Sequence, residues 1–181
     1  MRLAIIGIQG SGKGTQAKLI AKKLKLKRVA IGELARKEIK SKSKEGKILA
    51  KYMNKGLLAP NKIINQLVLK SVPKNNFIID GFPRDEKQLK VAKKIKLDKI
   101  ILLTLPKKEV YKRIKLRKKL EGRTDDEKKA LETRLKIFNE HSPKIIKHFK
   151  EKVVKINGNH PIKKVFSKIQ NALKKEKNLR K

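Results

Sequence analysis

Residues 7–16 read GIQGSGKGTQ and join a short apolar run to a segment with helical spacing. Glycines at such a junction let the backbone turn its N–H groups inward, toward the positive end of the helix that follows. The spacing is that of a phosphate-binding P-loop, G-x-x-x-x-G-K-[ST], except that Gly14 follows Lys13 and the hydroxyl of Thr15 comes one position late. We therefore predict a phosphate site, with Lys13 reaching the β- and γ-phosphates and Thr15 lying near Mg²⁺.

Apolar runs alternate with helical segments along the chain, which predicts an α/β fold. We expect a three-layer fold of the P-loop NTPase type, in which helices cover both faces of a five-stranded parallel sheet. The expected strands are residues 2–8, 26–31, 77–80, 99–105 and 152–156. The expected helices are residues 13–25, 32–54 with a break at 41–46, 60–71, 85–95, 106–119, 124–150 and a last one from 161.

The length and composition favour a single domain without disulfide bonds. The chain has 181 residues and no cysteine, so a thiolate zinc site is excluded as well. It contains no run of about 18 apolar residues, the length that a membrane helix needs, and it begins without the layout of a signal peptide. We expect a cytoplasmic protein.

The formal net charge of +36 has two interpretations. One is a nucleic-acid-binding protein; the other is a chain with solvated lysine faces that acts on small polyanionic substrates. The lysines are spread along the sequence, and aromatic residues, which would stack on bases, make up only 4%. We expect no specific nucleic-acid partner, and non-specific binding of polyanions at low salt.

Asp80 ends the expected strand at residues 77–80 and stands directly before Gly81. A carboxylate at the end of a buried strand can cap the turn that follows, or it can hold Mg²⁺ through water beside a P-loop. The P-loop favours the second role, so we predict that Asp80 and Thr15 form the magnesium site.

Only nine of the 52 basic residues are arginines. A chain that uses lysine for most positive charges should keep arginine where a planar fork must bind a phosphate or carboxylate through two bonds. Arg113 and Arg117 are four residues apart, and Arg123 and Arg134 are eleven apart, so each pair shares one helix face. The pairs could converge on transferring phosphates, or they could be exposed surface residues.

Residues 124–127, TDDE, fit a capping box at the start of a helix. The acids in this turn would also interact well with the positive end of the helix. Asp125 or Asp126 could additionally orient the neighbouring arginines.

These motifs together resemble the adenylate kinase family of nucleoside monophosphate kinases. GIQGSGKGTQ is similar to that family's P-loop variant, with glycine after the lysine. Residues 78–88, IIDGFPRDEKQ, resemble its D-G-[FY]-P-R segment with a glutamine four residues later, and residues 122–135, GRTDDEKKALETRL, resemble its R-x-D-D…R-L segment. A looser match is residues 31–38, IGELARKE. The resemblance covers nearly the whole chain.

The resemblance implies reversible transfer of the ATP γ-phosphoryl group to a nucleoside monophosphate, with Mg²⁺ and without zinc. It implies that residues 31–59 form an acceptor lobe, that residues 118–122 form a very short lid, and that residues 1–30, 60–117 and 123–181 form the core. The implied ATP-binding residues are Gly10, Ser11, Gly12, Lys13, Gly14, Thr15, Arg113 and Gly158. Those for the acceptor are Ile31, Arg36, Gly81, Arg84 and Gln88. The implied catalytic residues are Lys13, Arg84, Arg113, Arg117, Arg123 and Arg134, and the last four would line the transfer site.

Two residues bear on the identity of the acceptor base. Ile31 stands where adenylate kinases usually have a hydroxyl, and UMP/CMP kinases tend to have a small apolar residue there. Gln88 favours adenine instead, because its amide can both donate to and accept from the edge of that base. We expect AMP as the acceptor, with a UMP/CMP kinase on the same fold as the alternative. A basic nucleic-acid-binding P-loop protein is the alternative from another class.

Overall fold

Five parallel strands form one sheet at the centre of this computed structural model, which describes residues 1–122 and 126–178. The strands are β1 (Arg2–Gly7), β2 (Lys27–Ala30), β3 (Phe77–Asp80), β4 (Lys99–Thr104) and β5 (Val153–Asn157). Their order across the sheet is β2-β3-β1-β4-β5, and every neighbouring pair is parallel. The expected sheet and the α/β fold class are confirmed.

Helices connect the strands, as parallel pairing requires. They are α1 (Lys13–Leu24), α2 (Ile31–Lys40), α3 (Lys44–Met53), α4 (Asn61–Ser71), the short 3₁₀ helix η1 (Glu86–Gln88), α5 (Leu89–Lys94), α6 (Lys107–Glu121), α7 (Lys128–His148), the 3₁₀ turn η3 (Lys150–Lys152) and α8 (Ile162–Asn178). Among the described residues, no helix is both long enough and apolar enough to cross a membrane.

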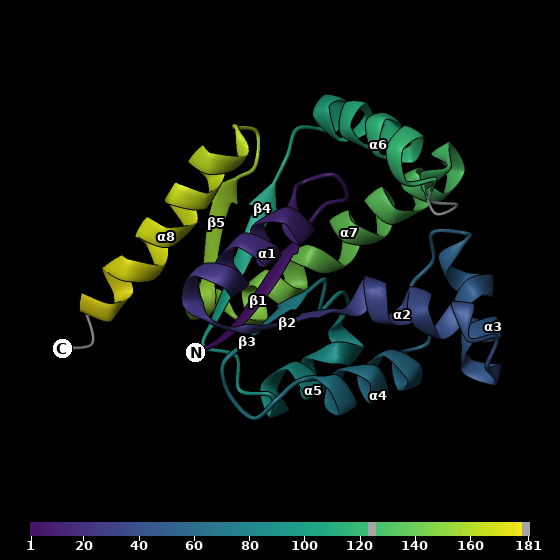
Figure 1. Cartoon of the computed structure of the whole chain (residues 1–181), viewed down its shortest axis with the longest axis horizontal. Helices are drawn as coiled ribbons and strands as arrows, with labels where there is room; N and C mark the ends of the chain where they lie inside the picture. The colour runs from purple at the N-terminus through teal and green to yellow at the C-terminus, as the bar shows by residue number, and fades with distance from the viewer. Residues whose placement is uncertain (123–125, 179–181) are drawn as a thin grey trace.

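The sheet separates two hydrophobic clusters, because alternate side chains of each strand point to opposite faces. Leu3 and Ile5 of β1 pack with α1 and α8, whereas Ala4 and Ile6 pack on the other face with α4, α5 and α7. Figure 1 shows α1 and α8 on one side of the strands and α7 on the other, with α2 and α3 projecting beyond the sheet. The carboxyl ends of the strands, where ligands bind in such sheets, therefore open toward α2, α3 and α6.

The segment between α6 and α7 departs from the expectation. Helix α6 continues to Glu121, so residues 118–121 of the predicted lid are helical, and α7 begins at Lys128 instead of residue 124. Glu127 precedes α7 without a side-chain cap, and the predicted capping box itself depends on Thr124. Asp126 accepts hydrogen bonds from Arg117 of α6. Thr124 and Asp125 lie outside the described residues.

Gly56 brings the segment after α3 into close contact with α7. Its φ is +73°, and an added Cβ would lie 2.1 Å from the carbonyl oxygen of Ala130. We expect Gly56→Ala to lower the free energy of unfolding by about 2–4 kcal/mol. Alanine is strained in the left-handed conformation, and its Cβ would also overlap the carbonyl oxygen of Ala130. Urea denaturation measures the change.

Gly122→Ala is the matched control for that substitution. Gly122 also has a positive φ, +58°, but an added Cβ would meet nothing within 4 Å in the described parts of the chain. We expect it to cost about 1 kcal/mol, the penalty of the left-handed conformation alone. Equal losses in the two variants would contradict the contact between Gly56 and α7.

Candidate active site

The loop between β1 and α1 adopts the conformation of a phosphate cradle. Gly10 and Gly12 have φ angles of +75° and +89°, which are costly for any residue with a Cβ atom. Ser11 is buried, and its hydroxyl has no hydrogen-bond partner within the described residues. A buried hydroxyl without a hydrogen-bond partner destabilises the folded protein. A ligand in the cradle that bonds to the Ser11 hydroxyl would remove this cost.

Lys13 begins α1 and turns its side chain back across this loop, where its Nζ donates to the carbonyl oxygen of Ile8 at 2.8 Å. Burial lowers the pKa of Lys13 from 10.5 to about 7. Asp80 partly opposes this fall in pKa, whereas Arg84, Arg117 and Arg134 add to it by repulsion. A bound anion would relieve both the desolvation and the repulsion, so the side chain fits a phosphate ligand.

Asp80 lies at the carboxyl end of β3, next to the start of α1. An added Cβ on Gly14 would be 3.5 Å from its Oδ2, so the carboxylate lies against the first turn of α1. Thr15 lines the same cleft one residue later. The carboxylate and the hydroxyl are the hard oxygen ligands that Mg²⁺ prefers, and nucleotide phosphates commonly supply the others. The described residues hold no cluster of three or more His, Cys, Asp or Glu side chains suited to a metal ion.

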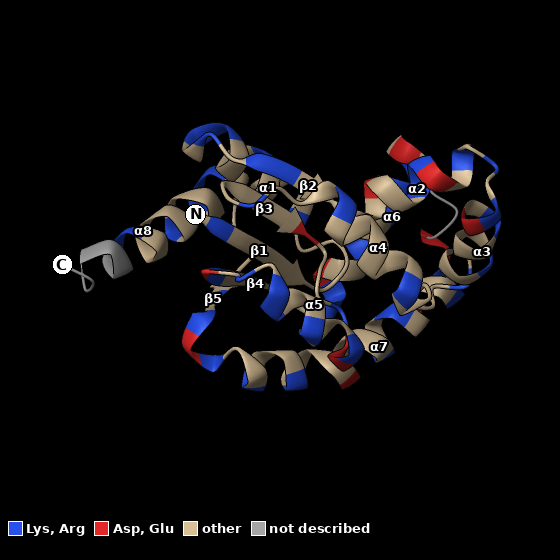
Figure 2. Cartoon of the chain, turned by 90° about the horizontal axis from the view of Figure 1, so that it is seen from below, with Lys and Arg blue, Asp and Glu red and all other residues tan. Residues whose placement is uncertain are grey.

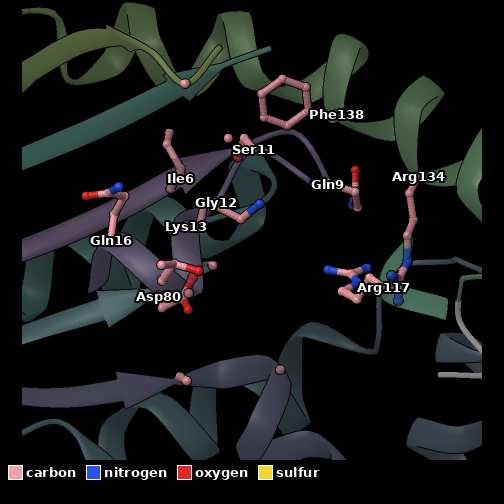
Figure 3. A pocket seen from close by; sticks show the side chains of 18 of the residues that line it. Ile6, Gln9, Ser11, Gly12, Lys13, Gln16, Asp80, Arg117, Arg134 and Phe138 are labelled. Atoms are coloured by element: carbon pink, nitrogen blue, oxygen red, sulfur yellow. The ribbon is translucent and has the colours of Figure 1, made fainter. Parts of the chain in front are cut away.

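Arg117 and Arg134 approach the cleft from α6 and α7. Arg117 donates through Nε to Oδ2 of Asp126 at 2.7 Å and through Nη2 to Oδ1 of the same carboxylate. Asp126 is only 4% exposed, so this fork fixes the guanidinium of Arg117. Asp126 therefore orients an arginine, as the sequence suggested. Figure 3 shows Arg117 and Arg134 together, across the cavity from Lys13 and Asp80.

Arg113 lies one helical turn before Arg117 but binds elsewhere. Its Nη1 donates to the carbonyl oxygen of Gly158 at 3.2 Å, and its Nε donates to Glu109 at 3.0 Å. Gly158 follows β5, and its N–H donates to Thr104 at 2.8 Å. Arg113 thus joins α6 to the turn after β5, so we place it at that end of the cleft.

Arg84 and Gln88 follow β3 on the other side of the P-loop. The Nε of Arg84 donates to the carbonyl oxygen of Gly81 at 2.8 Å, and its backbone N–H donates to Oε1 of Gln88 at 2.8 Å. Gln88 lines a small cavity of about 30 Å³ together with Ile31, and both side chains are almost fully buried. The two residues that the sequence linked to the acceptor base therefore meet at one cavity.

One cleft of about 550 Å³ joins these groups. Most of the predicted site residues line it: Gly10, Ser11, Gly12, Lys13, Gly14, Thr15, Arg36, Asp80, Gly81, Arg84, Arg113, Arg117, Arg134 and Gly158. Ile31 and Gln88 line the adjoining small cavity, which shares Gly81, Arg84 and Arg134 with the cleft. Arg123 lies outside the described residues.

Comparisons with known proteins agree with this geometry. The family model described as adenylate kinase matches residues 5–154. The chain belongs to the adenylate kinase family. It is 35% identical to the adenylate kinase of Buchnera aphidicola, over 93% of this chain and 95% of the relative. The adenylate kinases of Thermobifida fusca and Encephalitozoon cuniculi are 30% and 32% identical, and each alignment covers at least 95% of both chains.

The structure adds charged residues to the site of this adenylate kinase family member that the sequence interpretation did not place. Arg28 of β2 forms a fork with Glu33, at 2.9 and 2.6 Å, and its Nη2 lies 3.5 Å from Oδ2 of Asp80. Both residues line the cleft. Arg28 is one of the nine arginines, so the scarcity of arginine was the signal that could have found it.

Two exposed leucines complete the mouth of the cleft. Leu116 and Leu120 are 59% and 77% exposed, lie four residues apart on α6, and line the cleft. Their spacing on an otherwise basic helix was the available sequence signal. Both leucines therefore present apolar surface to the cleft on its α6 side.

Proposed function

We propose that this protein catalyses the reversible, Mg²⁺-dependent transfer of the ATP γ-phosphoryl group to AMP, which gives two molecules of ADP. The observation that carries the proposal is the pairing of two cationic sets across one cleft. Lys13 and the P-loop form one wall, and Arg84, Arg117 and Arg134 contribute the other positive groups. One set suits the phosphates of a donor, and the other suits the phosphate of an acceptor.

The chemistry in this proposal needs no protein nucleophile. The acceptor phosphate oxygen attacks the γ-phosphorus, and the bond from that phosphorus to the β–γ bridging oxygen breaks. Positioning and electrostatic stabilisation of the charge on the transferring group then lower the barrier. Lys13, Arg117 and Arg134 would neutralise that charge, and Arg84 would hold the acceptor phosphate in line through its planar fork.

Magnesium would arrive with ATP. We propose that Asp80 binds the ion through water and that Thr15 lies beside it, because these oxygens are at the P-loop end of the cleft. The ion would supply positive charge to the donor phosphates. Arg28 would act on the carboxylate of Asp80, which it approaches to 3.5 Å, and would limit the directions in which that carboxylate can turn.

AMP is the acceptor that the small cavity supports. Gln88 offers both hydrogen-bonding functions of an amide, and Ile31 offers an apolar wall for the flat face of a base. The relatives named above are adenylate kinases, which favours this acceptor over UMP or CMP. We propose residues 31–59 as the acceptor lobe and the segment around residues 118–122 as the lid.

Phosphorus NMR of the purified protein with ATP, AMP and MgCl₂ tests this proposal. We expect the ATP and AMP signals to fall in equal amounts while twice that amount of ADP appears. Chelation of the metal with EDTA should abolish turnover, and excess MgCl₂ should restore it. Release of inorganic phosphate without loss of AMP would identify a hydrolase and would contradict the proposal.

The low pKa of Lys13 predicts uptake of a proton on binding ATP. Below pH 7 the free ammonium is already charged; above it the group is neutral, and negative phosphates raise its pKa again. Affinity for MgATP should therefore fall as pH rises above about 7. Calorimetry at pH 8.5 in buffers of different ionisation enthalpy should show uptake approaching one proton, with much less at pH 6. Equal uptake by Lys13→Met would show that another group titrates.

The positive charge needs no specific nucleic-acid partner under this proposal. Figure 2 shows lysine and arginine along many elements, among them α1, α4, α7 and α8, without confinement to one face. We propose that RNA or DNA binds only at low salt and is released by about 200 mM salt. Saturable binding that survives this salt concentration would contradict that view. The cytoplasmic location stays a prediction.

A further inference from the structure

A chain of polar side chains, buried at Asp85 and Gln88 and half-buried at Asn61, lies beside the cavity that Gln88 lines. Asp85 and Gln88 are 5% and 1% exposed. Nδ2 of Asn61 donates to Oδ2 of Asp85 at 2.9 Å, and Nε2 of Gln88 donates to Oδ1 of Asn61 at 2.7 Å. Oε1 of Gln88 then accepts from the backbone N–H of Arg84 at 2.8 Å. The chain therefore runs from a carboxylate through two amides to a backbone donor.

Both ends of this chain have a fixed hydrogen-bonding character. An ionised carboxylate only accepts hydrogen bonds, and a backbone N–H only donates them. Asp85 therefore requires that Asn61 turn its NH₂ toward it, which leaves the Asn61 carbonyl facing Gln88. Gln88 must then turn its NH₂ toward Asn61 and its carbonyl toward Arg84. Reversal of either amide would place two donors or two acceptors together.

The fixed direction decides what Gln88 can offer to a base. A side-chain amide has two N–H bonds and two acceptor lone pairs. One N–H of Gln88 donates to Asn61, and one lone pair accepts from the backbone N–H of Arg84. One N–H and one lone pair of Gln88 therefore remain for a ligand in the cavity. This pair matches adenine, whose N1 accepts and whose 6-amino group donates. Hypoxanthine has the opposite pattern, because its N1 carries a proton and its 6-oxygen accepts.

We propose that Asp85 and Asn61 are positioning residues that fix the direction of the Gln88 amide and thereby the preference for adenine over hypoxanthine. The proposal rests on the function proposed above and deepens it. Asp85 also accepts from the backbone N–H of Gln88 at 3.0 Å through its second oxygen. The Asp85 carboxylate thus binds the backbone N–H of Gln88 directly. Through Asn61, it also fixes the direction of the Gln88 side-chain amide.

Asp85→Asn is the decisive substitution, since it changes one oxygen into a donor at nearly constant volume. The new amide can still cap η1 with its oxygen, but its NH₂ then faces the NH₂ of Asn61. If the Asn61 amide turns to avoid this contact, its NH₂ meets the NH₂ of Gln88. If the new amide at position 85 turns instead, its NH₂ meets the backbone N–H of Gln88. We expect kcat/KM for AMP to fall about tenfold to a hundredfold, as for a buried donor without a partner. The ratio of kcat/KM for AMP to that for IMP should fall at least tenfold.

The double variant Asn61→Asp/Asp85→Asn provides the compensating test. The amide introduced at position 85 would donate to the carboxylate introduced at position 61. That carboxylate would also accept from Gln88, so the direction of Gln88 is restored. Asn61→Asp alone sets two carboxylates face to face and should reduce kcat/KM for AMP. The double variant should return to within about threefold of wild type in kcat/KM and in AMP-over-IMP selectivity, a coupling that a double-mutant cycle detects.

Asp98→Asn is the matched control, because it makes the same chemical change at a distance from the cleft. Asp98 pairs with Arg2 at 2.7 Å near the start of β1. We expect lower thermal stability in this variant and unchanged acceptor selectivity. If Asp85→Asn does not fold, Asn61→Leu is measured in its place, and it should also lose AMP-over-IMP selectivity.

The outcomes separate this inference from the proposed function. A wild-type protein that does not phosphorylate AMP would contradict the proposed function itself. An active wild type whose selectivity is unchanged in Asp85→Asn, or a double variant that is no better than Asp85→Asn, would overturn the positioning role alone. Loss of selectivity in Asp85→Asn with recovery in the double variant would support it.

Discussion

Lys13→Met should lower kcat about 10²- to 10³-fold, the effect of losing one preorganised group that stabilises transition-state charge. Methionine keeps much of the length of lysine, so the loss would be one of charge and hydrogen bonding. The Nζ of Lys13 is desolvated and is repelled by Arg84, Arg117 and Arg134, so a negative phosphate there would be stabilised. The change should also weaken MgATP binding at neutral pH. A coupled assay and direct titration measure the two effects.

Lys22→Met is the control for this substitution. Lys22 lies in the last turn of the same helix, α1, and its side chain is exposed. Lys22→Met removes the same single positive charge as Lys13→Met. It therefore tests whether the net charge of the protein alone explains nucleotide binding. We expect kcat and the affinity for MgATP to stay within twofold of wild type. A comparable loss in both variants would refute the specific role of Lys13.

Arg84→Lys should lower kcat/KM for AMP about 30- to 300-fold while the KM for ATP changes little. The substitution keeps the positive charge but removes the planar fork that can bind a phosphate through two parallel bonds. It also removes the bond from Nε of Arg84 to the carbonyl of Gly81, which helps to aim the guanidinium. Initial rates with each nucleotide varied in turn separate the acceptor effect from the donor effect.

Arg2→Lys controls for the loss of a fork elsewhere. Arg2 binds Asp98 through Nε and Nη2, at 3.2 and 2.7 Å, and does not line the cleft. We expect a modest loss of stability with kcat/KM for AMP within twofold of wild type. If Arg84→Lys affected ATP and AMP equally, Arg84 would not be specific to the acceptor.

The sequence predicted the fold well because its signals are local. The P-loop fixed β1 and α1, and the apolar runs at β3 and β4 ended within a residue of the expected positions. The start of α7 was missed by four residues, and just before it Asp126 binds Arg117 of α6. A local pattern cannot show this contact between two side chains nine positions apart.

The candidate site was predictable where a motif carried it and not where only the fold brings residues together. Lys13, Asp80 and Arg84 stand in recognisable motifs, and all three line the cleft. Arg28 approaches Asp80 only because β2 and β3 are neighbours in the sheet. Asn61 meets Gln88 because α4 packs beside η1, and no spacing in the sequence indicates this.

The acceptor profile tests the central claim most directly. The purified protein with saturating MgATP would be given AMP, CMP and UMP in separate initial-rate series, and kcat/KM would be compared. We predict that AMP gives the highest value by at least tenfold. The fixed amide of Gln88 disfavours uracil, whose N3 carries a proton and whose 4-oxygen accepts, and the relatives, which are adenylate kinases, favour AMP over CMP. A higher value for CMP or UMP, or no transfer to any of the three, would contradict the account.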